Sequence, residues 1–254
     1  MGNKRTQDGV VAARRERRSP DGRAGTVNPK FLAEREERIN QNPLVAMNPK
    51  QKDYIELIDT KATIIATGYA GTSKTYIPTV IACDKYRTGQ IDKIVFTRPN
   101  ISNSKSLGYF GGDLIAKMEN WLMPVMNILR DRLGPEVVEI AIKRGDIEFV
   151  PMEVVKGYSA ENCFFIVDEA EDLTYDEAKK IVTRQGKNCK MVLAGDISQS
   201  ELKEKSGLKA LIDIANEYGF IDMGLVDFNN KGDIVRGEAC KNWIIGFERW
   251  EGRE

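Results

Sequence analysis

Residues 64–78, IIATGYAGTSKTYIP, carry the groups that a phosphate-binding loop requires. The nucleotide-loop pattern G-x-x-x-x-G-K-[ST] lies between a strand and a helix; Gly68, Lys74 and Thr75 fit it, whereas Ser73 replaces the second glycine. In such a loop the backbone amides bind phosphate, the lysine reaches the β- and γ-phosphates, and the Thr hydroxyl binds Mg²⁺. The alternative is a Gly-rich turn without a ligand. The candidate binding residues are Gly68, Tyr69, Ala70, Gly71, Thr72, Ser73, Lys74 and Thr75.

A second motif, CFFIVDEAED, is an apolar run that ends in Asp168 and Glu169. If the run is a buried parallel strand, both carboxylates lie at its C-terminal end, where α/β sheets bind ligands. Asp168 would then bind Mg²⁺, and Glu169 would orient or deprotonate the attacking water. The alternative is a strand that ends in acidic surface residues.

A third motif, KMVLAGDISQ, is another apolar strand, and it is followed by Gln199. A glutamine at this place can hydrogen-bond a γ-phosphate or the attacking water. Taken alone, the motif is also compatible with a simple turn. The three motifs occur in the expected order within one domain-sized span, and this joint occurrence favours nucleotide chemistry.

The elements that must position these residues alternate along the chain. The pattern predicts strands at 62–67, 93–97, 147–150, 163–169 and 190–196, and an edge strand at 220–226. It predicts helices from Lys74 to about Arg87 and at 117–134, 174–186, 207–219 and 240–250. Strands that alternate with helices indicate an α/β core with a mainly parallel sheet covered on both faces.

Composition limits the chemistry further. The 254 residues are 41% hydrophobic, enough for one sizeable core, and they include no histidine. Any catalysis must therefore use carboxylates, lysine, arginine and backbone amides. The four cysteines are widely spaced and mostly lie in apolar segments, so we expect reduced, buried thiols. Without a signal peptide or a run of about 18 apolar residues, we expect a soluble cytoplasmic protein with no membrane partner.

The N-terminal part differs from the rest. Residues 1–42 hold 10 Lys+Arg against 6 Asp+Glu, and the apolar content of residues 1–30 is too low for a core. We predict a flexible basic arm at 1–42, with room for a short helix between the Asn-Pro pairs of NPKFLAEREERINQNP, and a folded domain at 43–254. The arm is either a solvated tail or a nucleic-acid-binding segment. Its candidate contacts are Arg14, Arg15, Arg17 and Arg18.

Together the motifs GYAGTSKTY, FFIVDEAEDLT and KMVLAGDISQ, with the triplet TRP at 97–99 and LGYFGGDL at 107–114, resemble the PhoH family of phosphate-starvation-inducible ATPases. The resemblance covers about residues 44–250. It implies a RecA-like P-loop NTPase core related to superfamily-one helicases, with ATP and Mg²⁺ as ligands. The compact form without a nuclease domain looks like a bacteriophage-encoded member, and the bacterial host's cytoplasm would then be its location.

The resemblance also implies roles for single residues. It assigns Lys74 and Thr75 to phosphate and Mg²⁺, Asp168 to metal and Glu169 to hydrolysis. It adds Gln199 as a γ-phosphate sensor, Gln51 beside the adenine and Arg236 as a late arginine that reaches a γ-phosphate in its own subunit or in the next one. For Arg236 an ion pair with Asp233 or Glu238 is the structural alternative. Two departures from the family are Ser73 and Glu171, which stands where the family usually has glutamine.

For function, the resemblance implies Mg²⁺-dependent ATP hydrolysis on RNA or single-stranded nucleic acid, with Arg98 facing the strand and a ring of six like subunits. The segment after residue 97 is equally well explained as a surface insertion that packs on the next subunit. The main alternative function is an ATP-binding assembly or nucleic-acid-binding module with little or no hydrolysis. A small-molecule kinase is less favoured because no acceptor-binding lid is evident.

Overall fold

The computed structural model describes residues 39–99, 114–152 and 154–252, except the side chains of 114–122 and 251. All of these residues belong to one compact unit, residues 37–254. The predicted short helix and the candidate arginines of the arm, Arg14, Arg15, Arg17 and Arg18, lie outside the described residues.

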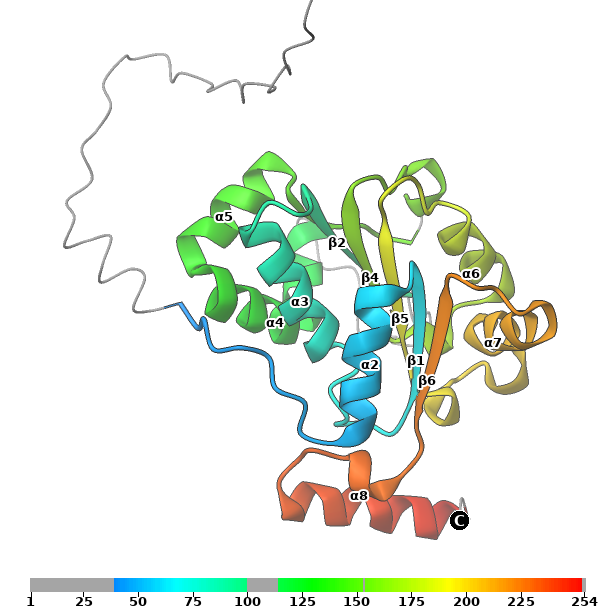
Figure 1. Ribbon diagram of the computed structural model, residues 1–254. Coiled ribbons are helices and arrows are strands. Elements are labelled where there is room, and N and C mark those ends of the chain that lie inside the picture. Colours follow the sequence, from blue (N-terminus) through cyan, green and yellow to red (C-terminus); the bar gives the residue numbers. More distant parts are fainter. Residues whose placement is uncertain (1–38, 100–113, 153, 253–254) are drawn as a thin grey trace, which may run out of the picture. The chain divides into compact units, whose positions relative to one another are not determined.

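A six-stranded sheet forms the centre of the unit (Figure 1). Its strands are β1 (Thr63–Gly68), β2 (Lys93–Thr97), β3 (Ile147–Phe149), β4 (Cys163–Val167), β5 (Lys190–Ala194) and β6 (Met223–Phe228). They lie in the order β3-β2-β4-β5-β1-β6, and each neighbouring pair is parallel. The predicted α/β fold with a mainly parallel sheet is therefore confirmed. The edge strand is also confirmed, although β6 begins three residues later than predicted.

Helices cover both faces of the sheet (Figure 1). They are α2 (Pro49–Thr60), α3 (Tyr76–Arg87), α4 (Leu114–Leu133), α5 (Pro135–Arg144), α6 (Tyr175–Val182) and α7 (Gly207–Tyr218), whereas α8 (Glu238–Glu251) lies beyond the end of the strands. Residues of α2 to α5 form one hydrophobic cluster with the sheet, and residues of α6 and α7 form a second cluster on the opposite face. The nearly continuous apolar runs of β4 and β5 follow from this burial on both sides. No helix among the described residues has the length and apolar character needed to cross a membrane.

Two boundaries differ from the sequence prediction in a way that matters for the site. Helix α3 begins at Tyr76 rather than Lys74, because Lys74 and Thr75 still belong to the turn and Thr75 is the N-cap residue. Strands β4 and β5 end at Val167 and Ala194, two residues earlier than predicted. The polar residues that follow each strand lie at the carboxyl edge of the sheet, where the amide of Asp168 still donates to the carbonyl oxygen of Thr97 at 3.0 Å.

Local signals explain α2 and α5, the two helices that the sequence pattern did not predict. Helix α2 has Pro49 in its first turn, and the Asn48 side chain accepts a hydrogen bond from the Gln51 amide at 2.8 Å. Helix α5 begins with Pro135 and ends at Gly145, whose left-handed conformation closes the helix. Both helices are short, which makes their apolar period hard to recognise.

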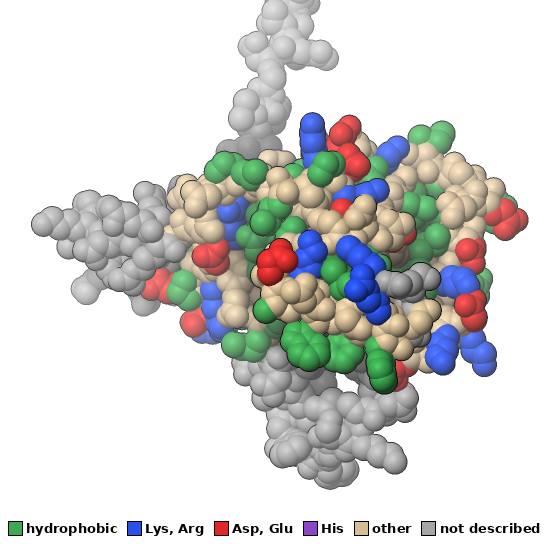
Figure 2. Space-filling view, turned by 90° about the horizontal axis from the view of Figure 1, so that it is seen from below, with side chains coloured by type: hydrophobic (Ala, Val, Ile, Leu, Met, Phe, Trp, Pro, Cys, Tyr) green, Lys and Arg blue, Asp and Glu red, His purple; other side chains and the backbone are tan. Residues whose placement is uncertain are grey.

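The cysteines are free thiols, as expected: Cys83, Cys163 and Cys189 are buried, and Cys240 is exposed. Cys240 belongs to α8, a helix without a buried residue among those described. The aromatic side chains of α8, Trp243, Phe247 and Trp250, are 67%, 59% and 88% exposed. Figure 2, seen from the α8 side, shows hydrophobic side chains gathered along one edge of this face beside Lys and Arg side chains. The predicted amphipathic helix is present, and its apolar side faces outward.

Candidate active site

The loop between β1 and α3 depends on glycine at two positions. Gly68 has φ +106°, and a Cβ there would lie 2.3 Å from the carbonyl oxygen of Phe228 in the neighbouring β6. Gly71 has φ +78°, and its Cβ would lie 2.5 Å from Cγ of Arg236. A side chain at either position would both clash and strain the backbone. The loop can therefore approach β6 and Arg236 only because these residues are glycines.

Ser73 occupies the position where the nucleotide-loop pattern has its second glycine, and its φ is +72°. The backbone thus keeps the left-handed conformation for which glycine is usual, at a cost of about 1–2 kcal/mol for a residue with a Cβ. That the loop binds phosphate despite this substitution stays a prediction. The irregular backbone also explains why helix α3 begins only after Thr75.

Lys74 folds back into the loop. Its Nζ donates to the carbonyl oxygens of Gly68 at 2.5 Å and Tyr69 at 2.7 Å. Burial lowers the pKa of the Lys74 amine, whereas nearby carboxylates, first Asp196 and then Glu171, oppose that shift. The amine is therefore held at the mouth of the loop by groups that an anionic ligand could replace.

Thr75 and Asp168 meet across the gap between the loop and the end of β4. The Thr75 hydroxyl donates to Oδ1 of Asp168 at 2.6 Å. Two oxygen ligands this close suit neighbouring positions around one Mg²⁺, which binds oxygen at about 2.1 Å. The described residues contain no cluster of three or more His, Cys, Asp or Glu side chains able to hold a metal alone. These residues therefore fit an ion that takes its remaining ligands from water and a phosphate group.

Glu169 has a strained backbone and a charged partner. Its φ is +49°, which is unusual for a residue other than glycine, and its Oε1 forms an ion pair with Nη2 of Arg98 at 2.7 Å. Burial raises the pKa of the Glu169 carboxyl, and Arg98 acts in the opposite direction. Strain of this kind persists only where the surrounding structure enforces it, and it is often found at functional sites.

The turn after β5 adds Gln199. Asp196 holds this turn: its Oδ1 accepts from the amide and hydroxyl of Ser198 at 3.0 and 2.5 Å, and its Oδ2 accepts from Nε2 of Gln199 at 2.8 Å. Sequence reasoning did not name Asp196 as a site residue. The signal was present in the same motif, GDISQ, because an Asp before a short turn commonly caps it.

These groups surround one cavity of about 670 Å³. It brings together most of the residues predicted from sequence: the loop from Ala70 to Thr75, Asp168, Glu169, Gln199 and Arg236. Sequence reasoning did not foresee its apolar wall, which consists of Met47, Tyr76, Pro124, Val125, Ile128 and Val235. The combination of phosphate-binding amides, a lysine, carboxylates and an apolar wall suits a nucleoside phosphate.

Gln51, assigned by the resemblance to the adenine, does not line this cavity. It is only 2% exposed, its Nε2 donates to the carbonyl oxygen of Thr72 at 3.2 Å, and its Oε1 accepts from the amide of Met47 at 2.8 Å. Both ends of the side-chain amide are therefore engaged with the backbone. In this structure Gln51 links the phosphate loop, through Thr72, to Met47, which lines the cavity.

Arg236 contacts the loop of its own chain. Its side chain lies over Gly71, and the amide of the preceding Val235 donates to the carbonyl oxygen of Gly71 at 3.0 Å. Within the described part of the chain, Arg236 forms no ion pair with Asp233 or Glu238, so the structural alternative is not observed. The guanidinium instead belongs to the wall of the cavity.

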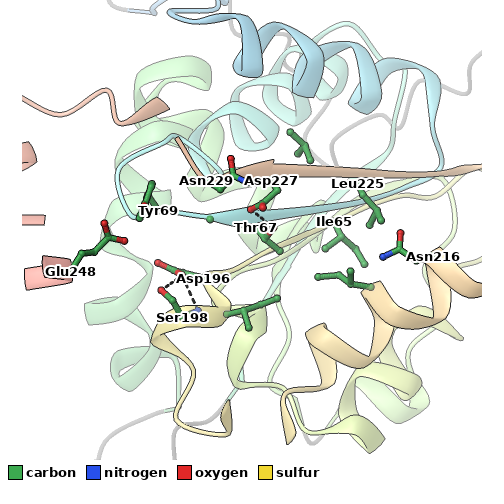
Figure 3. Close-up of a pocket in the computed structure, with 14 residues that line it drawn as sticks. Ile65, Thr67, Tyr69, Asp196, Ser198, Asn216, Leu225, Asp227, Asn229 and Glu248 are labelled. Carbon is green, nitrogen blue, oxygen red and sulfur yellow. Dashed lines mark hydrogen bonds between the residues drawn. The ribbon is translucent and has the colours of Figure 1, made fainter. Parts of the chain in front are cut away.

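A second cavity of about 540 Å³ is lined by Gly68 and Tyr69 of the same loop (Figure 3). Its apolar end includes Ile65 and Leu225. Its polar end includes Asp196, Asp227 and Glu248, and Asp227 accepts from the Thr67 hydroxyl at 2.9 Å. Burial, followed by a hydrogen bond with Glu248, raises the pKa of the Tyr69 phenol. Through Tyr69 and Glu248, α8 thus contacts the base of the phosphate loop.

The family model and the curated relatives that match this chain point to the same family. The family model described as PhoH-like protein matches residues 43–248. A PhoH-like protein of Bacillus subtilis is 33% identical over 201 residues, covering 78% of this chain and 62% of the relative. Protein PhoH of Escherichia coli is 32% identical over 210 residues, which cover 81% of this chain and 58% of the relative. The chain thus spans about three fifths of the length of these relatives.

Solved structures match more weakly. The large terminase of a thermophilic bacteriophage has a TM-score of 0.46 at 11% identity and covers 82% of this chain and 50% of that one. The UvsW helicase of bacteriophage T4 has a TM-score of 0.43 at 11% identity and covers 78% and 66%. With scores this low, the fold assignment rests on the sheet and the loop described above.

Proposed function

The chain belongs to the PhoH-like protein family, and from that premise we propose that it binds and hydrolyses ATP with Mg²⁺ and acts on RNA or single-stranded nucleic acid. One observation carries the proposal. The phosphate loop, the Thr75–Asp168 pair and Glu169 all border a single cavity at the carboxyl edge of a parallel sheet. This is the edge at which open α/β sheets bind their ligands.

In the proposed binding mode, ATP phosphates replace the carbonyl oxygens that now accept from Lys74. The loop amides and the Lys74 amine then bind the phosphate oxygens, and Arg236 neutralises charge at the far end of the same cavity. Thr75 and Asp168 would hold Mg²⁺, which would offset the negative charge of the phosphate groups.

For hydrolysis, we assign Glu169 to the attacking water and Gln199 to its orientation or to the γ-phosphate. Burial raises the pKa of Glu169, so its carboxylate is a stronger base than an exposed glutamate. The Asp196 carboxylate already fixes the Gln199 amide. Both side chains lie at the cavity wall, as a water-activating pair requires.

Arg98 is the proposed link to nucleic acid. It follows β2 at the carboxyl edge of the sheet and forms the ion pair with Glu169. A phosphate of the polymer that attracts Arg98 would weaken this ion pair and leave Glu169 available to water. Nucleic acid would in this way stimulate hydrolysis.

Variants of the loop and of Glu169 test the assignment. We expect Lys74→Ala to lose nucleotide binding. We expect Glu169→Gln to bind ATP but to release phosphate more slowly by at least about 10²-fold. Phosphate release and binding of a fluorescent ATP analogue provide the two measurements. Lys209→Ala, a change on the surface of α7, is the matched control. Phosphate release by Lys74→Ala at the unmodified rate would remove the loop from the mechanism.

The basic arm can be tested separately. Deleting residues 1–30 removes eight Lys+Arg. If these side chains bind phosphates, the slope of log affinity for single-stranded RNA against log salt becomes shallower by several units. The slope is obtained by measuring the affinity for RNA at salt concentrations from about 50 to about 200 mM. An unchanged slope would leave the arm as a solvated tail.

A second candidate function is an ATP-dependent assembly module with little or no hydrolysis. The observation that favours it is that both proposed hydrolytic side chains are already engaged, Glu169 with Arg98 and Gln199 with Asp196. A ring of six like subunits remains part of either proposal. Phosphate release with and without RNA, together with particle mass with and without ATP, distinguishes the two: an ATP-dependent increase in mass without turnover supports the module.

A further inference from the structure

Glu171 is a buried carboxyl group beside the nucleotide cavity. It lies three residues after Asp168, in the short helical turn Ala170–Asp172, and is 6% exposed. It belongs to the wall of the 670 Å³ cavity, and its Oε2 has no hydrogen-bond partner within the described structure. An ionised oxygen without a partner is costly in such a place. The carboxyl therefore needs either a proton or a donor from a ligand.

The surrounding atoms hold this side chain in place. The hydroxyls of Ser200 and Ser206 both donate to the Glu171 carbonyl oxygen, at 2.8 and 2.7 Å. On the other side, a Cβ at Gly195 would lie 2.4 Å from Oε2, so the carboxyl fills the space that this glycine leaves open. In this structure Oε2 therefore lies against the backbone of Gly195, which has no side chain to displace it.

Charged groups approach Glu171 from each neighbouring element. They are Lys74 from the phosphate loop and Glu169 and Asp172 from its own turn; after β5, the backbone amide of Asp196 also reaches the carboxyl. The following turn contributes the neutral Ser200 and Ser206. Burial raises the pKa of Glu171 to about 7; backbone amides of Glu171 and Asp196 oppose the shift, and the charges of Glu169 and Asp172 add to it.

We propose that Glu171 takes up a proton when nucleotide phosphates enter the cavity, and that the protonated carboxyl then donates a hydrogen bond to a phosphate oxygen. The proton comes from solvent and forms the O–H bond at the carboxyl group; no other bond changes. The reason is electrostatic, since phosphate brings further negative charge toward a buried carboxylate whose neighbours are already acidic. The inference rests on the proposed nucleotide binding.

The proposed behaviour depends on the residue type at position 171. A glutamine of the same shape would present a neutral N–H donor at every pH, whereas glutamate must first bind a proton. Nucleotide affinity should therefore depend on pH through Glu171. Above neutral pH the expected decrease approaches tenfold per pH unit, because one proton is taken up per nucleotide bound.

Calorimetric titration with Mg²⁺ and ADP tests the proposal without hydrolysis. At pH 7.0 (about the pKa of this carboxyl), repeating the titration in buffers of different ionisation enthalpy gives the number of protons taken up. For the unmodified chain we expect up to about half a proton per ADP, since about half of the carboxyl is ionised before binding. For Glu171→Gln we expect almost none and a flat pH profile of affinity. Asp176→Asn removes an exposed acid of α6 that lies outside the cavity; it is the matched control and should behave like the unmodified chain.

The outcomes separate this inference from the proposed function. ADP binding with the same proton uptake in the unmodified chain and in Glu171→Gln overturns the inference alone. Absence of ADP binding in every protein at every pH overturns the proposed function, and the inference with it. If Glu171→Gln does not fold, the pH dependence of ADP affinity in the unmodified chain provides the test. An affinity that stays constant from about pH 6 to about pH 8, a range that brackets the pKa, contradicts the proposal.

Discussion

At the residue scale, Ser73 shows how the loop tolerates a departure from its pattern. Its φ of +72° is the conformation that the pattern reserves for glycine, and no hydrogen bond of its side chain was identified in the described structure to offset the strain. Ser73→Gly would remove a backbone strain of about 1–2 kcal/mol from the folded state. Glycine also increases the conformational entropy of the unfolded chain, which cancels part of this gain. We therefore expect a net gain of about 0–1 kcal/mol in the free energy of unfolding.

Urea unfolding measures this gain, and ADP titration should show affinity within about tenfold of the unmodified chain. Lys203→Gly is a matched control, because Lys203 also has a positive φ of 51° and lies outside the cavity. It should stabilise the fold by a similar amount and leave nucleotide affinity unchanged. A Ser73→Gly variant that unfolds more easily, or that loses nucleotide, would show that the serine side chain has a role of its own.

At the scale of elements, the segment after β6 contacts the phosphate loop at two positions. Val235 and Arg236 contact Gly71, and α8 begins two residues later and reaches Tyr69 through Glu248. The resemblance left open whether Arg236 acts on its own subunit or on the next. Because the side chain already lies over its own loop, we predict that it acts in its own chain.

We therefore expect Arg236→Ala to lower phosphate release by about 10³-fold or more, as for arginines that neutralise a transferred phosphoryl group. A mixture of Lys74→Ala and Arg236→Ala chains should stay inactive after verified exchange, since neither chain has a complete site. Activity that returns in the mixture would mean that the arginine acts across an interface. Lys241→Ala, a basic residue on α8 outside the cavity, serves as the control for a change of charge on this helix.

The sequence predicted those elements that have a strong local signal. The buried runs of β2, β4 and β5 and the glycines of the loop leave few alternatives, and their order along the chain placed Lys74, Asp168 and Gln199 at one edge. The contacts of Gln51 could not be predicted, because they depend on how α2 packs under the loop. The same is true of the Arg98–Glu169 pair, whose partners come from different strands.

At the scale of the whole molecule, the acidic groups of the cavity link folding to pH. Burial raises the pKa of both Glu169 and Glu171 above the value of an exposed glutamate. Below that ordinary value both carboxyls are protonated in the folded and the unfolded chain, and they cost nothing. As pH rises toward 7, the unfolded chain releases these protons more readily than the folded chain does, so the free energy of unfolding decreases.

Glu171→Gln should remove the larger part of this dependence. Folding raises the pKa of Glu171 from 4.5 to about 7. The substitution should therefore increase the free energy of unfolding more at pH 8 than at pH 5, by an amount on the order of 3 kcal/mol. Urea unfolding of both proteins at the two pH values, without nucleotide, gives this difference. Equal effects of the substitution at pH 5 and pH 8 would mean that Glu171 ionises in the folded chain as easily as in the unfolded chain. The buried oxygen beside Gly195 would then have a donor that the structure does not include, and the site would hold that group instead of a proton.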